Sequence, residues 1–319
     1  MSAVHPPTAA EHDESTGSVL AALAANTTIA IAKGTAAVLT GSPALFAETL
    51  HTVADTGNEV FLYVAVKRSR RDPDPSHPLG YGSERWFWAL LAAVGMFVVG
   101  GAVSVWEGIQ AILDPPELEA FWVGVGVLVV ALVLDGASRT VAIRQLRKQA
   151  RRRGVSVRQL LGESADPTVV TVYFEDTIDV LGAALALLAL ILHRVTGSGV
   201  PDAIVTLIIG LLLAYTAYRL VKRNRGLLSG ESVPERYVAW LHEQLEAAPE
   251  VASVTGIEAI YLGASDVQAA VGLRMRAGMD GEQVAEALAR LRAELKEEIP
   301  ALRRLYLTPV PARPQQDPV

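Results

Sequence analysis

The sequence of 319 residues predicts an α-helical membrane protein with six transmembrane helices and a small C-terminal cytoplasmic α+β domain. Three observations predict this fold class. Hydrophobic residues make up 51% of the chain, and most of them gather in six long blocks. Basic residues gather in alternate loops between these blocks. The last third of the chain instead alternates amphipathic helical patterns with short strand-like runs, as soluble domains do.

Each apolar block is long enough to cross a bilayer, because about 20 helical residues span a hydrocarbon core of about 30 Å. Pro43, Pro167 and Pro201 stand at the starts of blocks, where the first helical turn needs no N–H. The six predicted helices cover residues 19–39, 43–66, 86–112, 121–143, 167–192 and 201–220.

The predicted domain boundaries follow from these patterns. They are a disordered cytoplasmic tail at 1–17, the six-helix transmembrane domain at 18–224, the cytoplasmic α+β domain at 229–312 and a disordered tail at 313–319. In the soluble domain the order is helix, strand, strand, helix, strand, at 234–248, 251–262, 266–277, 281–299 and 302–310.

The charges of the loops predict the orientation in the membrane. The second, fourth and sixth blocks are each followed by a basic loop, and basic loops mark the cytoplasmic side. Both termini are therefore expected in the cytoplasm, with Trp86 and Trp88 in the inner aromatic belt. The basic residues are Lys67, Arg68, Arg70, Arg71, Arg144, Arg147, Lys148, Arg151, Arg152, Arg153, Arg158, Lys222, Arg223 and Arg225.

Composition excludes several classes of protein. The chain has no cysteine, so disulfides and thiolate metal sites are excluded. The net charge of −6 argues against a nucleic-acid partner. The polar, acidic N-terminus lacks the basic region and cleavage site of a signal peptide.

Ionisable residues inside the second and fifth blocks are the candidate metal ligands. His51 and Asp55 are four residues apart and share one helix face, and Glu175 and Asp179 repeat this spacing on the fifth block. Ionisable groups at such depth face the bundle interior and usually mark an ion pathway. Glu48 and Asn58 lie on the same stripe as the first pair and are candidate accessory residues.

The depth of the two pairs predicts that they meet. With a rise of about 1.5 Å per residue, His51 comes level with Asp179, and Asp55 with Glu175. One imidazole and three carboxylates at one depth would form a tetrahedral N/O site of the kind that zinc accepts. The alternative, scattered polar residues that serve helix packing, does not account for two matched pairs on oppositely directed helices.

Three other charged residues in the apolar blocks have structural explanations. Asp176 points about 100° away from Glu175, and we expect a hydrogen bond to a neighbouring helix, with an accessory ligand or proton acceptor as alternatives. Asp135 has Arg139 one turn on and is expected to pair with it, an accessory ligand role being the alternative. Lys33 is either a snorkelling side chain or the partner of a buried carboxylate.

The stretch LTGSPALFAETLHTVADTGNEV, followed by HPLGYGSER, resembles the cation diffusion facilitator family. The resemblance extends from Val19 to Pro311, and LDGASRTVAI and EDTIDVLG are similar to its zinc-transporter-nine-like branch. It implies a transport site made of four residues, a ferredoxin-like or metallochaperone-like cytoplasmic domain, and a homodimer formed through that domain. It also implies metal–proton exchange by alternating access. The implied transport-site residues are His51, Asp55, Glu175 and Asp179.

The sequence departs from the family pattern at several positions. Glu175 stands where zinc exporters of the family usually have His, which makes a harder site and leaves Mn²⁺, Fe²⁺ and Co²⁺ as alternatives. The loop after the second block has Asp74 and His77 but Tyr81 where a further His often stands, so a second metal site there is left open, with a turn-capping role for His77 as the other interpretation.

Few other histidines could bind metal. His242 is the one histidine of the soluble domain, so the two-metal sensor site known in some members is not expected. His5 and His12 of the N-terminal tail are expected to be solvent-exposed.

The sequence therefore predicts a divalent cation transporter, zinc first, that exports the ion from the cytoplasm by proton-coupled antiport. His51 is the natural proton carrier because histidine changes charge near neutral pH. The alternatives are a Mn, Fe or Co transporter of the same fold and a transport-inactive scaffold or regulatory protein. An enzyme is not expected, since the HExxH motif of zinc proteases is absent. A channel is not expected either, since nothing in the sequence resembles a selectivity filter. No prosthetic group is expected. In a bacterium the location would be the plasma or inner membrane.

Overall fold

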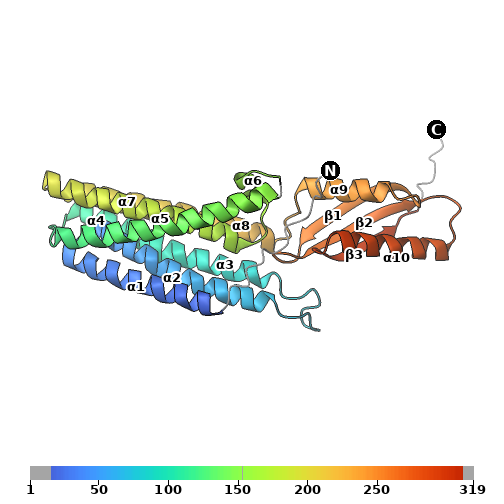
Figure 1. Cartoon of the computed structure of the whole chain (residues 1–319), viewed down its shortest axis with the longest axis horizontal. Coiled ribbons are helices and arrows are strands. Elements are labelled where there is room, and N and C mark those ends of the chain that lie inside the picture. The colour runs from blue at the N-terminus through green and yellow to red at the C-terminus, as the bar shows by residue number, and fades with distance from the viewer. Residues whose placement is uncertain (1–15, 153, 312–319) are drawn as a thin grey trace.

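The computed structural model describes residues 16–152 and 154–311. Figure 1 shows an elongated molecule with a helical bundle at one end and a small α/β domain at the other. Most of the predicted tails, including His5, His12 and residues 313–319, lie outside the described residues. The first helix begins at Thr16, just inside the predicted N-terminal tail.

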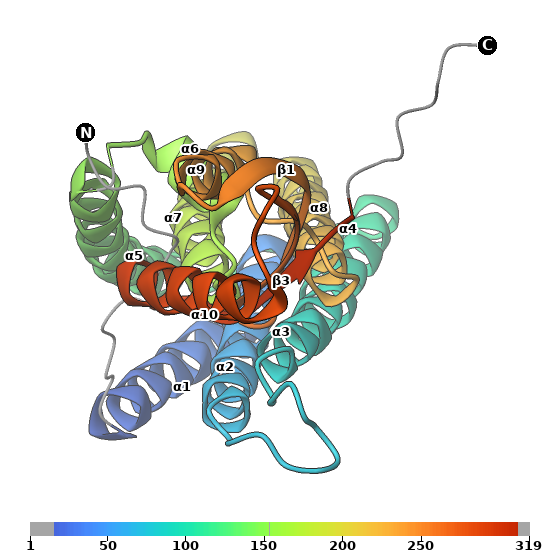
Figure 2. The same cartoon turned by 90° about the vertical axis from the view of Figure 1, so that its right-hand side faces the viewer.

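The bundle consists of long helices that follow the predicted blocks closely. Figure 2 views the molecule from the side of the C-terminal domain and shows α5 beside α7 and α4 beside α8. The elements are α1 (Thr16–Thr40), α2 (Pro43–Ser69), α3 (Glu84–Gly95), η1 (Met96–Ala102), α4 (Val103–Leu113), α5 (Phe121–Arg152), α7 (Pro167–Thr196) and α8 (Val200–Leu228). A short α6 (Val157–Glu163), which the sequence analysis did not predict, precedes α7.

Four spans in the described part of the chain are both long and apolar enough to cross a membrane. They are Glu84–Leu113, Phe121–Arg152, Pro167–Thr196 and Val200–Leu228. The chain is thus a multi-pass integral membrane protein. The helices α1 and α2 have 25 and 27 residues and pack beside these spans.

Local sequence signals explain where the ligand-bearing helices begin. The Ser42 side chain caps α2 by accepting a hydrogen bond from the N–H of Leu45 at 3.2 Å, and Pro43 follows it. Asp166 caps α7 by accepting from the N–H of Thr168 at 3.0 Å, and Pro167 follows. A capping side chain followed by proline in the first turn is a common pattern at helix N-termini.

The third span contains a π-helix that the sequence analysis did not predict. We expected one helix over 86–112, whereas η1 separates α3 from α4. Beyond it, α4 approaches α8 so closely that a Cβ at Gly108 would lie 2.7 Å from Cγ of Leu207. Glycine allows this approach because it has no side chain.

The C-terminal domain contains a mixed three-stranded sheet in the described residues. The strands β1 (Val251–Tyr261), β2 (Val267–Met275) and β3 (Leu302–Pro309) lie in the order β1-β2-β3, with the first pair antiparallel and the second parallel. The helices α9 (Glu235–Glu246) and α10 (Gly281–Glu298) pack on it, and α10 begins with a capping box between Asp280 and Gln283. Each predicted element of this domain is present within a few residues.

The domain docks against the end of the bundle through buried contacts. The hydroxyl of Tyr261 on β1 donates to the carbonyl of Glu163 at the end of α6, at 3.2 Å. Beside it, within the bundle, the indole Nε1 of Trp86 donates to the carbonyl of Ala165 at 2.8 Å. Trp86 is 2% exposed and belongs to the core of the C-terminal domain. Its predicted place in a lipid-facing aromatic belt is therefore wrong, because docking of the domain covers it.

Candidate metal centre

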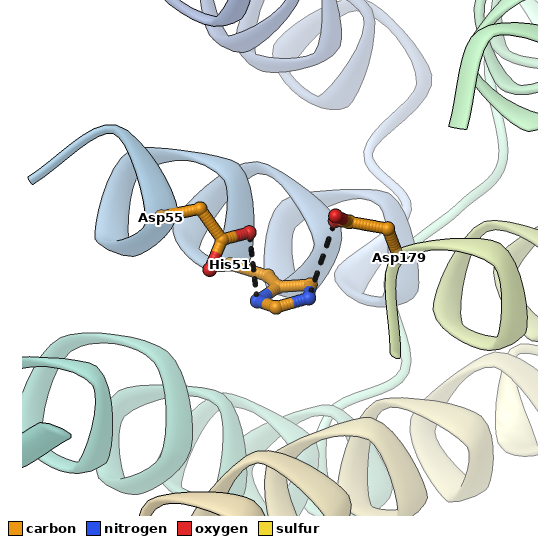
Figure 3. Close-up of side chains that lie close together, drawn as sticks. All are labelled: His51, Asp55 and Asp179. Atoms are coloured by element: carbon orange, nitrogen blue, oxygen red, sulfur yellow. Dashed lines mark ion pairs between the residues drawn. The ribbon is translucent and has the colours of Figure 1, made fainter. Parts of the chain in front are cut away.

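Three of the predicted ligands come together inside the bundle. His51 and Asp55 lie on one face of α2, and Asp179 reaches them from α7. Nδ1 of His51 is 3.3 Å from Oδ2 of Asp55, and its Nε2 is 3.3 Å from Oδ1 of Asp179. Figure 3 shows the imidazole between the two carboxylates. One ligand atom from each residue lies within 4.8 Å of the others.

The three side chains, which we call the cation cluster, suit a metal ion chemically. His51 is 1% exposed and Asp55 6% exposed, and Asp179 is half-buried. Neither nitrogen of His51 and neither carboxylate oxygen of Asp55 makes a hydrogen bond within the described residues. Buried polar atoms normally have such partners, so the missing hydrogen bonds point to a ligand. Ligand atoms around a tetrahedral zinc lie about 3.4 Å apart. Zinc binding would therefore draw the three side chains closer together.

The fourth predicted ligand, Glu175, is not part of this cluster. Its buried carboxylate accepts a hydrogen bond from Nδ2 of Asn58, which lies one turn beyond Asp55 on α2. The level of Glu175 within the membrane stays a prediction, and its side chain is bound to Asn58. Rotation of Glu175 away from Asn58 would be needed to bring it to the ion.

Glu48 has a different partner. Its Oε2 is 3.0 Å from Nζ of Lys33, which also donates to the hydroxyl of Thr52 at 3.0 Å. Lys33 is 1% and Glu48 0% exposed, so the pair is fully buried between α1 and α2. Of the two interpretations of Lys33 from sequence, the structure selects the partner of a buried carboxylate.

Asp176 and Asp135 are not members of the cation cluster in the described residues. The hydroxyl of Ser138 on α5 donates to Oδ1 of Asp176 at 3.1 Å, so Asp176 faces a neighbouring helix. Oδ2 of Asp135 and Nε of Arg139 are buried and make no hydrogen bond within the described chain. The structure therefore shows no intrahelical hydrogen bond between these two atoms.

The loop between α2 and α3 holds Asp74 and His77 in a compact turn. The Asp74 carboxylate accepts hydrogen bonds from the Ser76 hydroxyl at 2.5 Å and the Tyr81 hydroxyl at 2.7 Å, and from the N–H groups of Ser76 and His77. These bonds, that of the Ser76 side chain first, hold the pKa of Asp74 well below its usual range. His77 stacks on Tyr81 with ring centroids 4.1 Å apart. The carboxylate is thus already bound within the turn.

In the C-terminal domain, His242 is 3.6 Å from Glu246 on the exposed side of α9. That pair lies one helical turn apart and needs no metal to explain it.

Sequence analysis missed a second buried cluster at the other end of the bundle. His193, in the last turn of α7, faces Asp202, in the first turn of α8, across 3.6 Å. Asp202 directly follows Pro201, so the sequence indicates that it lies at the start of a helix. Its burial could not be predicted, because it depends on contact with the start of α2, which is remote in sequence.

The cation efflux transmembrane domain profile matches residues 19–229, which is the helical bundle. The chain belongs to the cation efflux family. This confirms the resemblance to cation diffusion facilitators, and the relatives place the chain in the zinc-transporter-nine-like branch. The members are transporters and not enzymes.

Several curated members of the cation efflux family align with the chain. The mitochondrial proton-coupled zinc antiporter SLC30A9 of Homo sapiens is 33% identical over 231 residues, covering 72% of this chain and 41% of that protein. Metal tolerance protein C4 of Arabidopsis thaliana is 36% identical over 61% of this chain and 43% of its own length. The chain thus spans less than half the length of these two relatives.

A third relative matches almost end to end. The magnetosome protein MamB of Paramagnetospirillum magneticum is 26% identical over 91% of this chain and 93% of its own length. Its alignment extends well beyond the bundle, whereas the family profile ends at residue 229.

Proposed function

We propose that this chain exports a divalent metal ion, zinc first, from the cytoplasm in exchange for protons. The observation that carries the proposal is the cation cluster of His51, Asp55 and Asp179, which joins α2 to α7 inside the bundle. Family membership supports transport of a metal cation, and the name of the human relative supports zinc and proton coupling.

Competition between metal and protons for the same side chains would couple the two fluxes. A protonated His51 carries an N–H on both nitrogens, and each nitrogen faces a carboxylate at 3.3 Å. A metal ion instead needs a neutral imidazole and ionised carboxylates, so its binding releases protons. Metal and protons therefore exclude each other, as antiport by alternating access requires. His51 is the proton carrier in this scheme.

The proposed architecture has six transmembrane helices, with α1 and α2 completing the four apolar spans. We place both termini in the cytoplasm, because the basic loops lie at the end of the bundle that carries the C-terminal domain. Residues 18–224 then form the transmembrane domain. Residues 229–312 form a ferredoxin-like cytoplasmic domain through which two copies dimerise, and β2–α10–β3 supplies its parallel β–α–β half.

The donor set leaves a second group of ions open. One imidazole among carboxylates is a harder site than the two-histidine alternative, and hard sites accept Mn²⁺, Fe²⁺ or Co²⁺. The bond between Glu175 and Asn58 reduces the carboxylates at the cluster to Asp55 and Asp179, which favours zinc over the harder ions.

The test is ion uptake by vesicles that contain the purified protein and have an acidic lumen. Zn²⁺, Mn²⁺, Fe²⁺ and Co²⁺ are offered to the wild type, to Asp55→Asn and to Glu107→Gln, a matched change of a half-buried carboxylate on α4. We expect zinc uptake by the wild type and by Glu107→Gln but not by Asp55→Asn. We also expect uptake to slow when the pH gradient is collapsed.

Each other outcome removes a defined part of the proposal. Uptake that is independent of the pH gradient would contradict proton coupling but would still support metal transport. Equal uptake by Asp55→Asn and the wild type would remove the cation cluster as the transport site. If the wild type moves none of the four ions, the transport-inactive scaffold is the better description.

A further inference from the structure

The end of the bundle away from the C-terminal domain is called the distal end here (Figure 1). Asp202 is a buried carboxylate in the first turn of α8. Its side chain is 0% exposed. Oδ1 accepts a hydrogen bond from the Ser42 hydroxyl at 3.1 Å and another from the N–H of Ala44 at 3.1 Å. Oδ1 of Asp202 on α8 thus accepts two hydrogen bonds from the start of α2. A negative charge is favourable at this position because of the helix dipole.

The other oxygen of Asp202 faces the third helix of the group. Oδ2 is 3.6 Å from Nδ1 of His193, which is 6% exposed in the last turn of α7. Neither atom makes a hydrogen bond within the described residues. A Cβ at Gly199 would lie 2.9 Å from Cβ of Pro115 and 3.5 Å from Cε1 of His193. Gly199 therefore lies between the connection of α4 and α5 and the His193 ring.

The three helices that meet at Asp202 include both helices of the cation cluster. His51 lies on α2 about 13 Å from Ser42, and Asp179 lies on α7 about 21 Å from His193 along the helix axis. An ion that leaves the cluster toward the distal end must pass between α2 and α7. Their distal ends are held side by side while Asp202 accepts the hydrogen bonds of Ser42 and Ala44 on α2 and faces His193 on α7.

We propose that Asp202 and His193 form a distal latch that keeps this end of the bundle closed and has to open in each transport cycle. This inference rests on the proposed transport function. Asp202 and His193 are positioning residues, since they do not touch the ion at the cluster. A purely structural cap on α2 would also use Asp202, but it would stay in place throughout the cycle.

The chain has no cysteine, so a single introduced cysteine is the only site that a maleimide can label. Ala183, one turn distal of Asp179 on α7 and fully buried, is changed to cysteine in the full-length protein in vesicles. Labelling by a membrane-impermeant maleimide from the distal side then reports opening of that end. Trypsin cleavage of the C-terminal domain identifies which vesicle side is distal. The test variants are Asp202→Asn and His193→Asn, and the control is Asp114→Asn, an exposed carboxylate of the α4–α5 connection.

We expect Asp202→Asn to raise the rate of distal labelling by on the order of tenfold, which corresponds to one lost charge-assisted hydrogen bond. His193→Asn should act in the same direction and Asp114→Asn should have no effect. Zinc binding by Asp202→Asn, measured by calorimetry, should stay within about twofold of wild type because the latch and the cluster are far apart. Zinc uptake should nevertheless fall.

Equal labelling of Asp202→Asn and Asp114→Asn would overturn the latch, even where the wild type transports zinc. If Asp202→Asn does not fold, His193→Asn supplies the comparison, since it removes only the contact with Oδ2 of Asp202. Labelling does not depend on metal transport, so the two proposals can fail separately. If only the transport proposal is wrong, the wild type takes up no metal, but Asp202→Asn still raises the rate of distal labelling.

Discussion

Oε1 of Glu48 lies directly against Gly182, so that a Cβ added at position 182 would be only 1.9 Å from this oxygen. The other oxygen of the same carboxylate pairs with Lys33. A single buried side chain therefore fixes how α1, α2 and α7 pack, one turn from His51. Glycine at 182 makes room for the carboxylate.

We expect Gly182→Ala to destabilise the protein by about 1–3 kcal/mol, because Glu48 has to move in a packed interior. The measurement is the thermal unfolding midpoint in detergent, which should fall by several degrees. Gly136→Ala on α5 is the control, since a Cβ there meets no atom within 4 Å. Equal midpoints for the two variants would show that Glu48 can leave its position at no cost.

Removal of the lysine should be more damaging than removal of both charges. Lys33→Met leaves Glu48 buried without its cation, and the loss of one partner of a buried pair costs about 3–5 kcal/mol. Adding Glu48→Gln to Lys33→Met should restore much of this stability. A double-mutant cycle on the unfolding midpoint measures the coupling, and additive effects would contradict the pairing.

Glu175→His should sharpen the preference for zinc. A second imidazole near the cluster makes the site softer, and softer nitrogen ligands favour Zn²⁺ over Mn²⁺. The ratio of Zn²⁺ to Mn²⁺ uptake under competition is the measurement, with Asp176→Asn as the neighbouring change on α7. An unchanged ratio in Glu175→His would mean that residue 175 stays beside Asn58 and never contacts the ion.

The Asp74 turn should withstand mild acid. A carboxyl whose folded pKa is depressed stabilises the folded state above its unfolded pKa of about 3.9, and that contribution is lost only as the pH falls through the folded value. The protection factors of the Ser76 and His77 amides in hydrogen exchange should therefore be the same at pH 7 and pH 4.5.

Asp74→Asn should reduce the protection of these amides at pH 7, because the neutral amide is a weaker acceptor for the four donors. Asp72→Asn, an exposed neighbour, is the matched control. A turn that keeps its protection in Asp74→Asn would show that stacking of His77 on Tyr81 is sufficient.

The limits of the helices could be predicted because their signals are local. Apolar blocks, the cap at Ser42 and the prolines at positions 43 and 167 set where the helices begin. The rise of an α-helix also placed His51 level with Asp179, and these two side chains do lie 3.3 Å apart. These results needed only the periodicity of one helix and the thickness of a bilayer.

Contacts that depend on helix rotation or docking could not be predicted. The rise per residue predicted that Glu175 is level with Asp55, but it could not predict which neighbour the side chain contacts. In the structure that neighbour is Asn58. Trp86 has the composition of a membrane-interface residue, and only the position of the C-terminal domain buries it. Asp202 looked like an ordinary helix start until the first turn of α2 was placed against it.

The π-helix η1 has a consequence for comparisons among members of the family. One extra residue in a single-turn π-helix offsets the faces of α3 and α4 by about 100° relative to an uninterrupted α-helix. Gly108, which faces Leu207, lies beyond this offset on α4. A homologue that lacks one residue between Met96 and Ala102 would present another side chain to α8. The spacing between α3 and α4 is therefore as much a determinant of the bundle as the identity of any residue in either helix.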